Sequence, residues 1–322
     1  MGLHGETVLV TGASGFVGAN LCRRLLSEGV AIHAILNPET RTWRIDDILN
    51  EIRTYEVDLC DAERVRRVVN EVRPSIIYHL AAHGAYPFQS DCAQILRVNV
   101  FGLWNLLSAC KEVGFRLFVN TGSSSEYGRK EFAMRETDPL DPDSFYAVAK
   151  ATQSFLCRHT ALLEGLPVLT VRLFSVYGPY EEPTRLVPAL MSAAHDGRPI
   201  KMVSSSTCRD FIHVDDVVDF YLRVSPKPDW AGEIVNLGTA VQSSMRDVVS
   251  TLEQVAGVPI DARWDSMPGR QWDSCNWVAD ISKLRRLTGF VPKISLAEGL
   301  TRTYRWFCEN AALYSGDGVR RC

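Results

Sequence analysis

The chain has 322 residues, of which 46% are hydrophobic and 23% charged, and 35 Lys and Arg against 38 Asp and Glu give a formal charge of −3. These proportions are ordinary for a soluble globular protein and exclude a disordered chain, a collagen and a coiled coil. Without a basic excess, nucleic acid is not expected as the main partner. At roughly 100–200 residues per domain, the length predicts two domains or one large α/β unit with an added lobe.

The chain lacks the sequence signals of membrane insertion, secretion and metal binding. No segment reaches the about 18 consecutive apolar residues of a membrane-spanning helix. The first six residues lack the basic start and apolar stretch of a secretory signal. The nine cysteines are odd in number and no two of them are two residues apart, so we expect neither a disulfide framework nor a bound metal. These features predict a cytoplasmic protein with reduced thiols and no membrane partner.

The first 120 residues alternate between strand-like and helix-like patterns. Strands are predicted over residues 7–10, 30–36, 54–57, 75–80 and 115–120, and helices over residues 16–28, 62–71 and 93–113. Gly29 and Gly114 follow the first and last of these helices, as glycines at helix C-termini often do. This alternation predicts an α/β fold with a doubly wound parallel sheet covered by helices on both faces.

The pattern changes from about residue 175, where prolines cluster and the predicted elements shorten. Two stretches, 168–173 and 233–237, still resemble members of a sheet. We assign the first domain to residues 1–174 with returning segments at about 208–240. A smaller α+β C-terminal lobe takes residues 175–207 and 241–322, of which the last nine, from Tyr314 on, are predicted to be poorly ordered.

Glycines at positions 12, 15 and 18 directly follow the first predicted strand and open the first predicted helix. Gly12 allows a tight turn, Gly15 a close approach to a pyrophosphate, and Gly18 close packing of the helix on the strand. The helix N-terminus would direct its N–H groups at the phosphates. The sequence therefore predicts a Rossmann-type NAD(P) loop with contacts from Gly12, Ser14, Gly15, Phe16, Val17 and Gly18.

The end of the second predicted strand bears on the choice of cofactor. NAD enzymes carry an acidic residue about 20 residues after the loop, which binds the ribose 2′-hydroxyl. Asn37 stands there instead, and Arg41 and Arg44 follow with guanidinium groups that suit a 2′-phosphate. This favours NADP(H) over NAD(H). It stays open whether Glu39 serves as the acid or whether the arginines are solvated surface.

Tyr146 and Lys150 stand four residues apart in a predicted helix over residues 144–164, so they share one helix face. An ammonium group near a phenol favours the phenolate and lowers the pKa of the tyrosine. Such a tyrosine can exchange a proton with a sugar hydroxyl or carbonyl while hydride moves to or from nicotinamide. The spacing alone is common by chance, so the glycine loop and the serine-rich strand end at 120–128 give it weight.

With these motifs the chain resembles the extended short-chain dehydrogenases/reductases that act on nucleotide-diphosphate sugars. The resemblance covers nearly the whole chain and includes residues 57–59, 79–82, 98–102, 172–179, 209–216, 268–270 and 279–283. It implies that the cofactor is bound by the glycine loop, by Asn37 and Arg41, and by eight further residues. These are Asp58, Leu59, Leu80, Ala81, Ala82, Asn99, Tyr146 and Lys150.

The resemblance also implies a catalytic set. Ser123 stands at the family's catalytic Ser/Thr, where its hydroxyl would hold the reacting sugar oxygen and hydrogen-bond to Tyr146. Tyr146 would transfer the proton. Lys150 would lower the pKa of Tyr146 and hold the nicotinamide ribose. Ser124 takes the place of Ser123 if the register is one residue off.

Sugar-nucleotide 4,6-dehydratases carry acids at the next two places, which here hold Ser124 and Ser125. Glu126 comes one place later and, on a strand, would point away from the sugar, whereas a bend in the chain there would re-aim it. Dehydration is therefore disfavoured.

For a nucleotide-diphosphate sugar, the resemblance implies phosphate and nucleotide contacts from Arg209 and Arg270, since guanidinium groups bind phosphates in a bidentate manner. Surface salt bridges are the alternative role for these arginines. The family often has Asn where Ser175 stands, which leaves the mode of diphosphate binding open. The candidate substrate contacts are His83, Tyr86, Ser124, Ser175, Arg185, Arg209 and Arg270.

We favour NAD(P)H-dependent reduction of a nucleotide-linked 4-keto sugar, because the dehydratase acids are missing and the second strand end suits NADP. The alternative is a nucleotide-sugar 4-epimerase with tightly bound NAD. A 4,6-dehydratase and a non-catalytic NADP-binding regulator are weaker hypotheses. The resemblance further implies a homodimer formed through the helices at 93–113 and 144–164.

Overall fold

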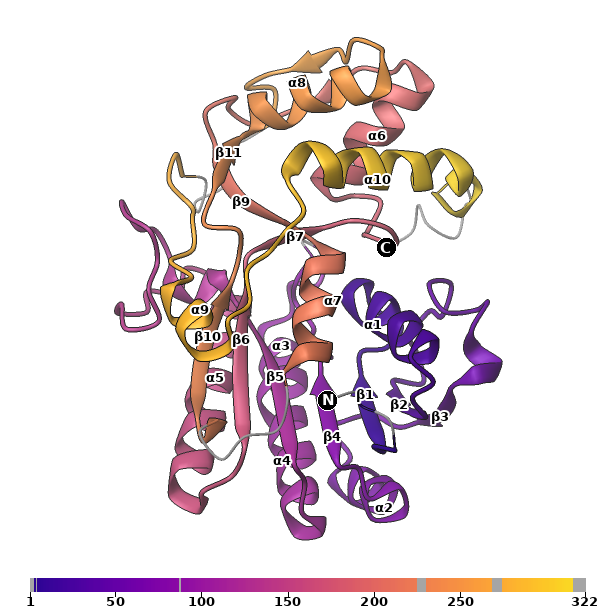
Figure 1. The fold of residues 1–322 in the computed structure, drawn as a ribbon, viewed down its shortest axis with the longest axis vertical. Coiled ribbons are helices and arrows are strands. Elements are labelled where there is room, and N and C mark those ends of the chain that lie inside the picture. The colour runs from indigo at the N-terminus through magenta and orange to yellow at the C-terminus, as the bar shows by residue number, and fades with distance from the viewer. Residues whose placement is uncertain (1–2, 4, 87, 225–229, 268–273, 315–322) are drawn as a thin grey trace. The chain divides into compact units, whose positions relative to one another are not determined.

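The computed structural model describes residues 3, 5–86, 88–224, 230–267 and 274–314. The chain forms two compact units. The first comprises Met1–Gly128, Pro139–Leu173 and Val218–Val235, and the second comprises Arg129–Asp138, Phe174–Val217 and Asn236–Cys322 (Figure 1). Among the described residues, none of the helices has both the length and the hydropathy needed to cross a bilayer. Of the predicted disordered tail, residues 315–322 lie outside the described residues. Tyr314 does not fit that prediction, because it ends a 3₁₀ turn and its hydroxyl donates to the Glu181 carbonyl at 3.0 Å.

A seven-stranded sheet in the order β10-β6-β5-β4-β1-β2-β3 organises the first unit. Its strands are β1 (Val8–Thr11), β2 (Ile32–Leu36), β3 (Arg53–Glu56), β4 (Ile76–His79), β5 (Leu117–Ser123), β6 (Val168–Leu173) and β10 (Glu233–Leu237). Strands β1 to β6 pair in parallel throughout. The predicted doubly wound α/β fold is confirmed, because apolar runs buried on both faces suit parallel strands between layers of helices.

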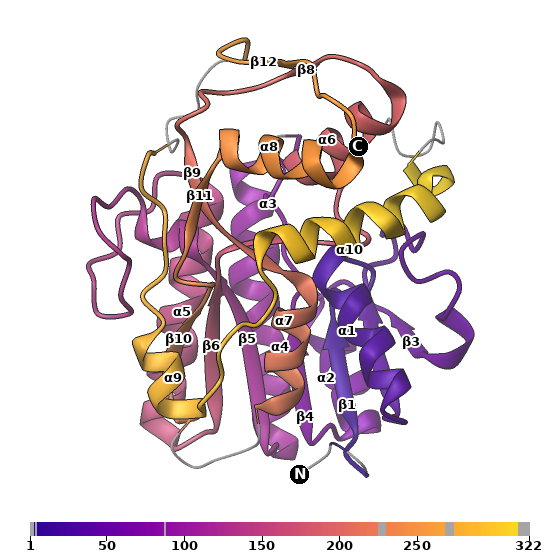
Figure 2. The ribbon, with the colours of Figure 1, turned by 45° about the horizontal axis from the view of Figure 1, so that its top comes forward.

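Helices cover both faces of this sheet. They are α1 (Phe16–Ser27), α2 (Ala62–Val72), α3 (Cys92–Leu96), α4 (Gly102–Val113), α5 (Phe145–Glu164) and α7 (Val214–Arg223). Leu9, Ile77 and Phe118 join one core with buried residues of α2, α4 and α5. On the other face Tyr78 stacks on Tyr221 of α7 and donates a hydrogen bond to its carbonyl oxygen at 2.9 Å. Figures 1 and 2 show α7 in front of the strands, beside α1.

The long helix predicted over 93–113 is interrupted by a turn of π-helix at Arg97–Phe101. The carbonyl of Asn99 inside this turn accepts a hydrogen bond at 2.7 Å from Nε2 of Gln153, which is buried on α5. A partner from a neighbouring helix can replace the backbone donor that a π-turn displaces. The sequence pattern gives no sign of this, since the apolar periodicity continues through it.

The second unit contains a three-stranded sheet in the order β11-β9-β7 and a parallel pair, β12-β8. Its elements are β7 (Ser175–Tyr177), α6 (Leu186–Asp196), β8 (Ile200–Lys201), β9 (Cys208–His213), β11 (Gln242–Ser244), α8 (Met245–Ala256), β12 (Ala262–Arg263), α9 (Ser282–Thr288) and α10 (Leu296–Glu309). Apolar side chains of α6, α8 and α10 form its core with Tyr177 and Phe211. A short 3₁₀ turn lies at Ala311–Tyr314 in this unit, and two others lie at Leu49–Glu51 and Ser124–Tyr127 in the first unit.

A buried carboxylate fixes the second unit's central strand. Asp210 accepts hydrogen bonds from the amides of Thr239, Ala240 and Ala279 and from the Thr239 hydroxyl. Burial raises the pKa of Asp210, and these hydrogen bonds oppose that rise. The carboxylate thus joins β9 to two later segments, since a buried charge is stable only when its oxygens are satisfied.

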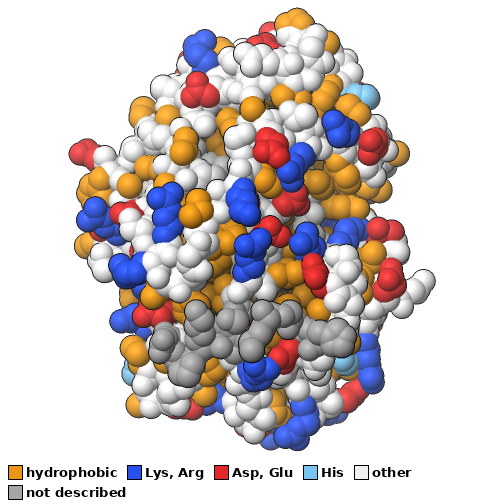
Figure 3. Space-filling model, in the orientation of Figure 1, with side chains coloured by type: hydrophobic (Ala, Val, Ile, Leu, Met, Phe, Trp, Pro, Cys, Tyr) orange, Lys and Arg blue, Asp and Glu red, His pale blue; other side chains and the backbone are white. Residues whose placement is uncertain are grey.

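Basic and acidic side chains alternate over the face drawn in Figure 3 and form no block of a single sign there. This mixture matches the small net charge of the chain.

Candidate active site

The strand order of the sheet reverses between β1 and β4, because β2 and β3 extend to one side and β5 and β6 to the other. Ligands of open α/β sheets bind outside the carboxyl ends of the strands at such a reversal. The loop from Gly12 to Gly18 leaves β1 at this point, and Leu80 to Ala82 leave β4 beside it.

The glycine loop has the geometry of a phosphate cradle. Gly12 has φ of +74°, and a Cβ there would lie 2.6 Å from the Ala81 amide nitrogen. A Cβ on Gly18 would overlap the Gly12 carbonyl oxygen, so the helix can start this close to the turn only with glycine. Gly15 is the N-cap of α1, and no side chain caps that end within the described chain. The amides at positions 16 to 18 can therefore face a diphosphate, which fits a dinucleotide.

The loop after β2 is held by short polar contacts. Asn37 Oδ1 accepts a hydrogen bond from the Glu39 amide at 2.9 Å, and the Ser14 and Thr40 hydroxyls lie 3.0 Å apart. Asn37 and Glu39 are exposed. Because its oxygen is used by the turn, the Asn37 amide group has its N–H donors left for a ribose hydroxyl.

The two arginines of this segment differ in environment. Arg41 is exposed, whereas Arg44 is buried, with its guanidinium carbon 4.3 Å from the ring centroid of Trp43. Arg44 is therefore a packed side chain. Of the two arginines that favoured a 2′-phosphate, Arg41 is the one at the surface.

The loops after β3 and β4 are fixed by their own hydrogen bonds. Asp58 Oδ1 accepts from the Cys60 amide at 2.9 Å, and Leu59 is buried. Asn99 is fully buried, and its amide group accepts from His83 N at 2.8 Å and donates to His83 O at 2.7 Å. A contribution of Asn99 to a cofactor site would thus run through the backbone of this loop. Tyr86, farther along it, stacks on Phe88 with ring centroids 5.4 Å apart.

Lys150 lies in the interior of the first unit. Its side chain is 2% exposed, and Nζ donates to the Thr121 carbonyl at 2.9 Å and lies 5.8 Å from the Tyr146 ring centroid. Burial lowers the pKa of Lys150 to about 8. Lys150 is therefore mainly protonated at neutral pH, beside a phenol that is only half-buried.

Ser123 ends β5 and is the N-cap of the turn Ser124–Tyr127. Its Oγ accepts from the Ser125 amide at 3.2 Å and lies 2.8 Å from the Ser125 hydroxyl. Either hydroxyl can donate in this pair, so Ser123 can turn its proton to another acceptor, such as a sugar oxygen, when the Ser125 hydroxyl is the donor. Ser124, the alternative, is buried.

The strand geometry assumed for Glu126 is wrong, because the residue lies in that 3₁₀ turn. Its side chain is fully buried and pairs with Arg172 of β6, at 2.7 Å between Oε2 and Nε. A carboxylate held in this way is not available as an acid for dehydration. Sequence reasoning missed this pair, although an arginine within the buried apolar strand 168–173 is a signal that an acidic partner exists.

The substrate candidates of the second unit lie on several elements. Arg209, on β9, donates to the Cys208 carbonyl at 2.7 Å, and its guanidinium carbon lies 5.0 Å from the ring centroid of buried Trp277. Ser175 pairs with Phe211 between β7 and β9. Arg185 is the N-cap residue of α6. Arg270 lies outside the described residues.

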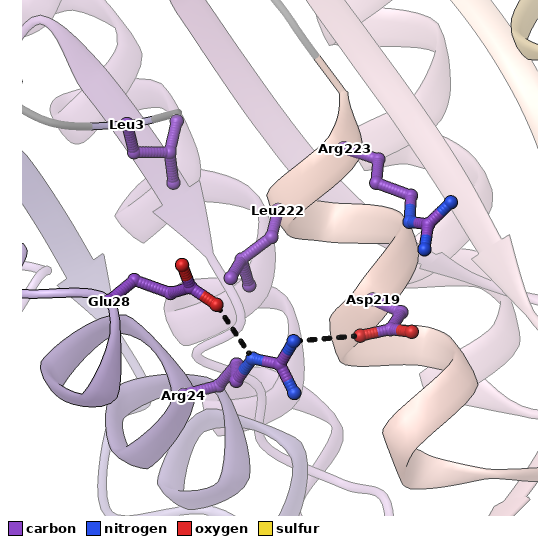
Figure 4. Close-up of a pocket in the computed structure, with 6 residues that line it drawn as sticks. All are labelled: Leu3, Arg24, Glu28, Asp219, Leu222 and Arg223. Carbon is purple, nitrogen blue, oxygen red and sulfur yellow. Dashed lines mark hydrogen bonds and ion pairs between the residues drawn. The ribbon is translucent and has the colours of Figure 1, made fainter. Parts of the chain in front are cut away.

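A surface recess in the first unit lies at the other end of α1 (Figure 4). It is lined by Leu3, Arg24, Glu28, Asp219, Leu222 and Arg223. Arg24 pairs there with Glu28 at 3.2 Å and with Asp219 at 3.6 Å. Arg24 follows Gly15, the N-cap of α1, by nine residues, or about 14 Å of helix, so this recess is separate from the cradle.

Comparison of the sequence with known proteins finds relatives of this chain. The sequence model described as "NAD dependent epimerase/dehydratase family" matches residues 8–238. A probable UDP-glucuronate 4-epimerase of Rhizobium meliloti is 29% identical over 94% of this chain and 97% of its own. A dTDP-glucose 4,6-dehydratase of Streptomyces griseus is 30% identical over 93% of each.

Among solved structures, the UDP-glucuronic acid 4-epimerase of Bacillus cereus, in complex with UDP-glucuronic acid and NAD, superposes with a TM-score of 0.83. It is 26% identical, over 94% of this chain and 99% of its own.

Proposed function

The chain belongs to the NAD dependent epimerase/dehydratase family, and on that premise we propose that it is a UDP-sugar 4-epimerase that keeps NAD bound. The observation that supports this is the buried Lys150, whose ammonium lies 5.8 Å from the Tyr146 ring centroid and donates to Thr121 of the strand that ends at Ser123, while Arg172 holds the nearby Glu126 carboxylate inside the unit. Relatives named as 4-epimerases support epimerisation over the 4-keto reduction that the sequence favoured.

NAD held at the glycine turn after β1 would supply the hydride acceptor and donor for C4 of the sugar, and this chain's own residues would handle the proton. Tyr146 accepts the proton of the C4 hydroxyl and returns it when the carbonyl is reduced. Charged Lys150 stabilises the phenolate, since an adjacent positive charge favours the ionised phenol. Ser123 donates to the reacting oxygen, where a second donor stabilises the developing charge.

Dehydration is a weaker assignment. A 4,6-dehydratase must protonate a leaving hydroxyl and remove the C5 proton, and the places that would supply acids hold Ser124 and Ser125. Glu126 is bound to Arg172 inside the unit.

We propose NAD as the cofactor. The preference for NADP rested on Asn37, Arg41 and Arg44, and of the two arginines only Arg41 is exposed. A structural relative has NAD bound. An asparagine amide can donate to a ribose hydroxyl without the charge of the usual acid.

For the substrate we propose that Arg209 binds the nucleotide diphosphate, because its planar guanidinium group is held over Trp277 and suits phosphate oxygens. The remaining candidate contacts are His83, Tyr86, Ser175, Arg185 and Arg270.

We propose a homodimer formed through α4 and α5. Phe145, Val148, Phe155 and Leu162 recur on α5 at spacings of three, seven and seven residues, and all are exposed. Phe101 and Trp104 are exposed at the start of α4. An apolar stripe at heptad-like spacing packs well against a second copy of itself. Phe155→Glu should yield a monomer in light scattering, whereas Phe132→Glu, at an exposed position of the second unit, should not; a dimer in both variants would refute this interface.

The function is tested by the cofactor and the product together. The purified protein is denatured and the released nucleotide identified, and the native protein is incubated with UDP-glucose, UDP-glucuronate and dTDP-glucose without added cofactor. We expect released NAD and a C4 epimer of a UDP-sugar. Released NADP, or consumption of NADPH with a 4-keto sugar nucleotide, would instead support the reductase.

A further inference from the structure

A buried ion pair joins the serine turn to strand β6. Arg172 Nε donates to Glu126 Oε2 at 2.7 Å, and the two side chains are 2% and 0% exposed. The Ser154 hydroxyl donates to the same oxygen at 2.7 Å, and Arg172 Nη1 donates to the Tyr127 hydroxyl at 2.9 Å. Apolar residues of similar volume often stabilise a fold as well as such a pair does, so stability does not by itself account for it.

The second carboxylate oxygen of Glu126 contacts the backbone that carries the catalytic serine. Glu126 Oε1 accepts from the Ser123 amide at 2.8 Å. A Cβ on Gly122 would lie 2.7 Å from this oxygen, so the carboxylate packs directly against the strand end. The backbone of Ser123 is therefore held by the Glu126 carboxylate, and Arg172 in turn holds that carboxylate.

Lys150 approaches the same strand end from α5. Its ammonium donates to the carbonyl of Thr121, which immediately precedes Gly122. Ser154, which binds Glu126, follows Lys150 by one helical turn on the same face. The carboxylate and the ammonium thus hold Ser123 and Thr121, the residues on either side of Gly122, and both charged side chains are buried.

We propose that Glu126 is a positioning residue for the reaction: its carboxylate holds Ser123 in place, and its negative charge lies against the strand end to which Lys150 is bonded. The contacts of Glu126 do not depend on the proposed function, whereas the roles of Ser123 and Lys150 in the reaction rest on it.

The titratable groups around Lys150 agree with this. Burial lowers the pKa of Lys150, whereas the charge of Glu126 raises it, ahead of the smaller effect of Cys157. His79 faces Lys150 from β4 and is neutral, because burial lowers the pKa of His79 to about 3. Arg172 pairs with Glu126 and is not among the charges that shift the pKa of Lys150, so its loss in a paired variant should not mask the loss of Glu126. Tyr146 is a further titratable group beside Lys150. Removing the Glu126 charge must therefore move the titration of Lys150 to lower pH.

The test uses paired substitutions, because Glu126→Gln alone would leave Arg172 buried and unpaired. In Glu126→Gln with Arg172→Gln, an amide oxygen still accepts from Ser123 N and only the charges are lost. In Glu126→Leu with Arg172→Met, the acceptor is lost as well. Val69→Ala, in the buried core of α2, controls for lost stability.

The pKa of Lys150 is measured directly by NMR of [¹³Cε]lysine. The sequence has only seven lysines, and the Lys150 signal is identified by its absence in Lys150→Met. We expect the midpoint to fall by about one pH unit in both paired variants, the low end of the effect of a nearby opposite charge. Val69→Ala should leave it unchanged. An unchanged midpoint in the Gln pair would overturn the charge role, whether or not the protein is an epimerase.

The positioning role is measured by kcat and KM below the Lys150 midpoint. The Gln pair should keep kcat within about threefold of the wild type, whereas the Leu and Met pair should lose at least about tenfold in kcat with KM unchanged, as for an interaction made in the transition state. Equal kcat values in the two paired variants would overturn the positioning role. If the wild type turns over no nucleotide sugar, the proposed function fails, and the NMR titration still decides the charge role.

Discussion

Replacement of Gly12 by alanine tests whether the turn after β1 is the dinucleotide cradle. Two penalties arise in the protein itself. The φ of +74° is unfavourable for alanine by about 1–2 kcal/mol. The added methyl would also lie 2.6 Å from the Ala81 nitrogen and 2.7 Å from the Leu80 carbonyl carbon, both of them backbone atoms. Forcing β4 and this loop apart adds about 1–3 kcal/mol, as overpacking does.

Gly29→Ala is the matched control, because Gly29 has φ of +71° and nothing within 4 Å of the added Cβ. It should carry only the backbone penalty of about 1–2 kcal/mol. Urea unfolding gives the two free energies, and calorimetry on protein from which the bound nucleotide has been removed gives the affinity for NAD. Gly12→Ala should be the less stable variant and should bind NAD at least about tenfold more weakly, while Gly29→Ala should bind it like the wild type. Equal stability losses and unchanged NAD binding in both variants would refute the reasoning.

Three further outcomes are expected. Tyr146→Phe should lower kcat by about 10²–10⁴-fold, the usual effect of general acid–base catalysis, while calorimetry finds NAD binding unchanged; normal turnover would contradict the proton-transfer role. Since the protonated form of Lys150 acts, and its pKa is about 8, activity should fall as pH rises through that value, and kcat flat to pH 10 would contradict this. Because burial lowers the pKa of His79 to about 3, the unfolded state binds a proton below about pH 6.5 that the folded state does not, which costs about 2 kcal/mol of stability by pH 5; urea midpoints of His79→Gln should fall less between pH 7 and 5 than those of the wild type.

The sequence predicts the sheet well because the apolar pattern within each strand and helix of the first unit is enough to identify it. Residues 168–173 and 233–237 were assigned to the sheet from their apolar composition, and both are strands with those bounds. The helix from 144 to 164 was also expected, and α5 begins at Phe145. Local patterns suffice here because both faces of a parallel sheet are buried.

The parts that the sequence did not predict depend on partners far along the chain. Glu126 turns inward because Arg172, in a later strand, supplies a charge for it. The π-turn around Asn99 is accompanied by a hydrogen bond from Gln153 to the carbonyl freed there. Arg44 could be taken for a surface phosphate ligand because nothing in the sequence shows that it packs on Trp43.

The most direct test of the epimerase account follows the hydrogen at C4 of the sugar. UDP-glucose carrying deuterium at C4 is incubated with the purified protein and no added cofactor, and the product is analysed by NMR and mass spectrometry. The account predicts a C4-inverted UDP-sugar that keeps its deuterium, because the hydride leaves and returns within one bound complex. An inverted product that has lost its deuterium, or a 4-keto-6-deoxy sugar, would contradict it.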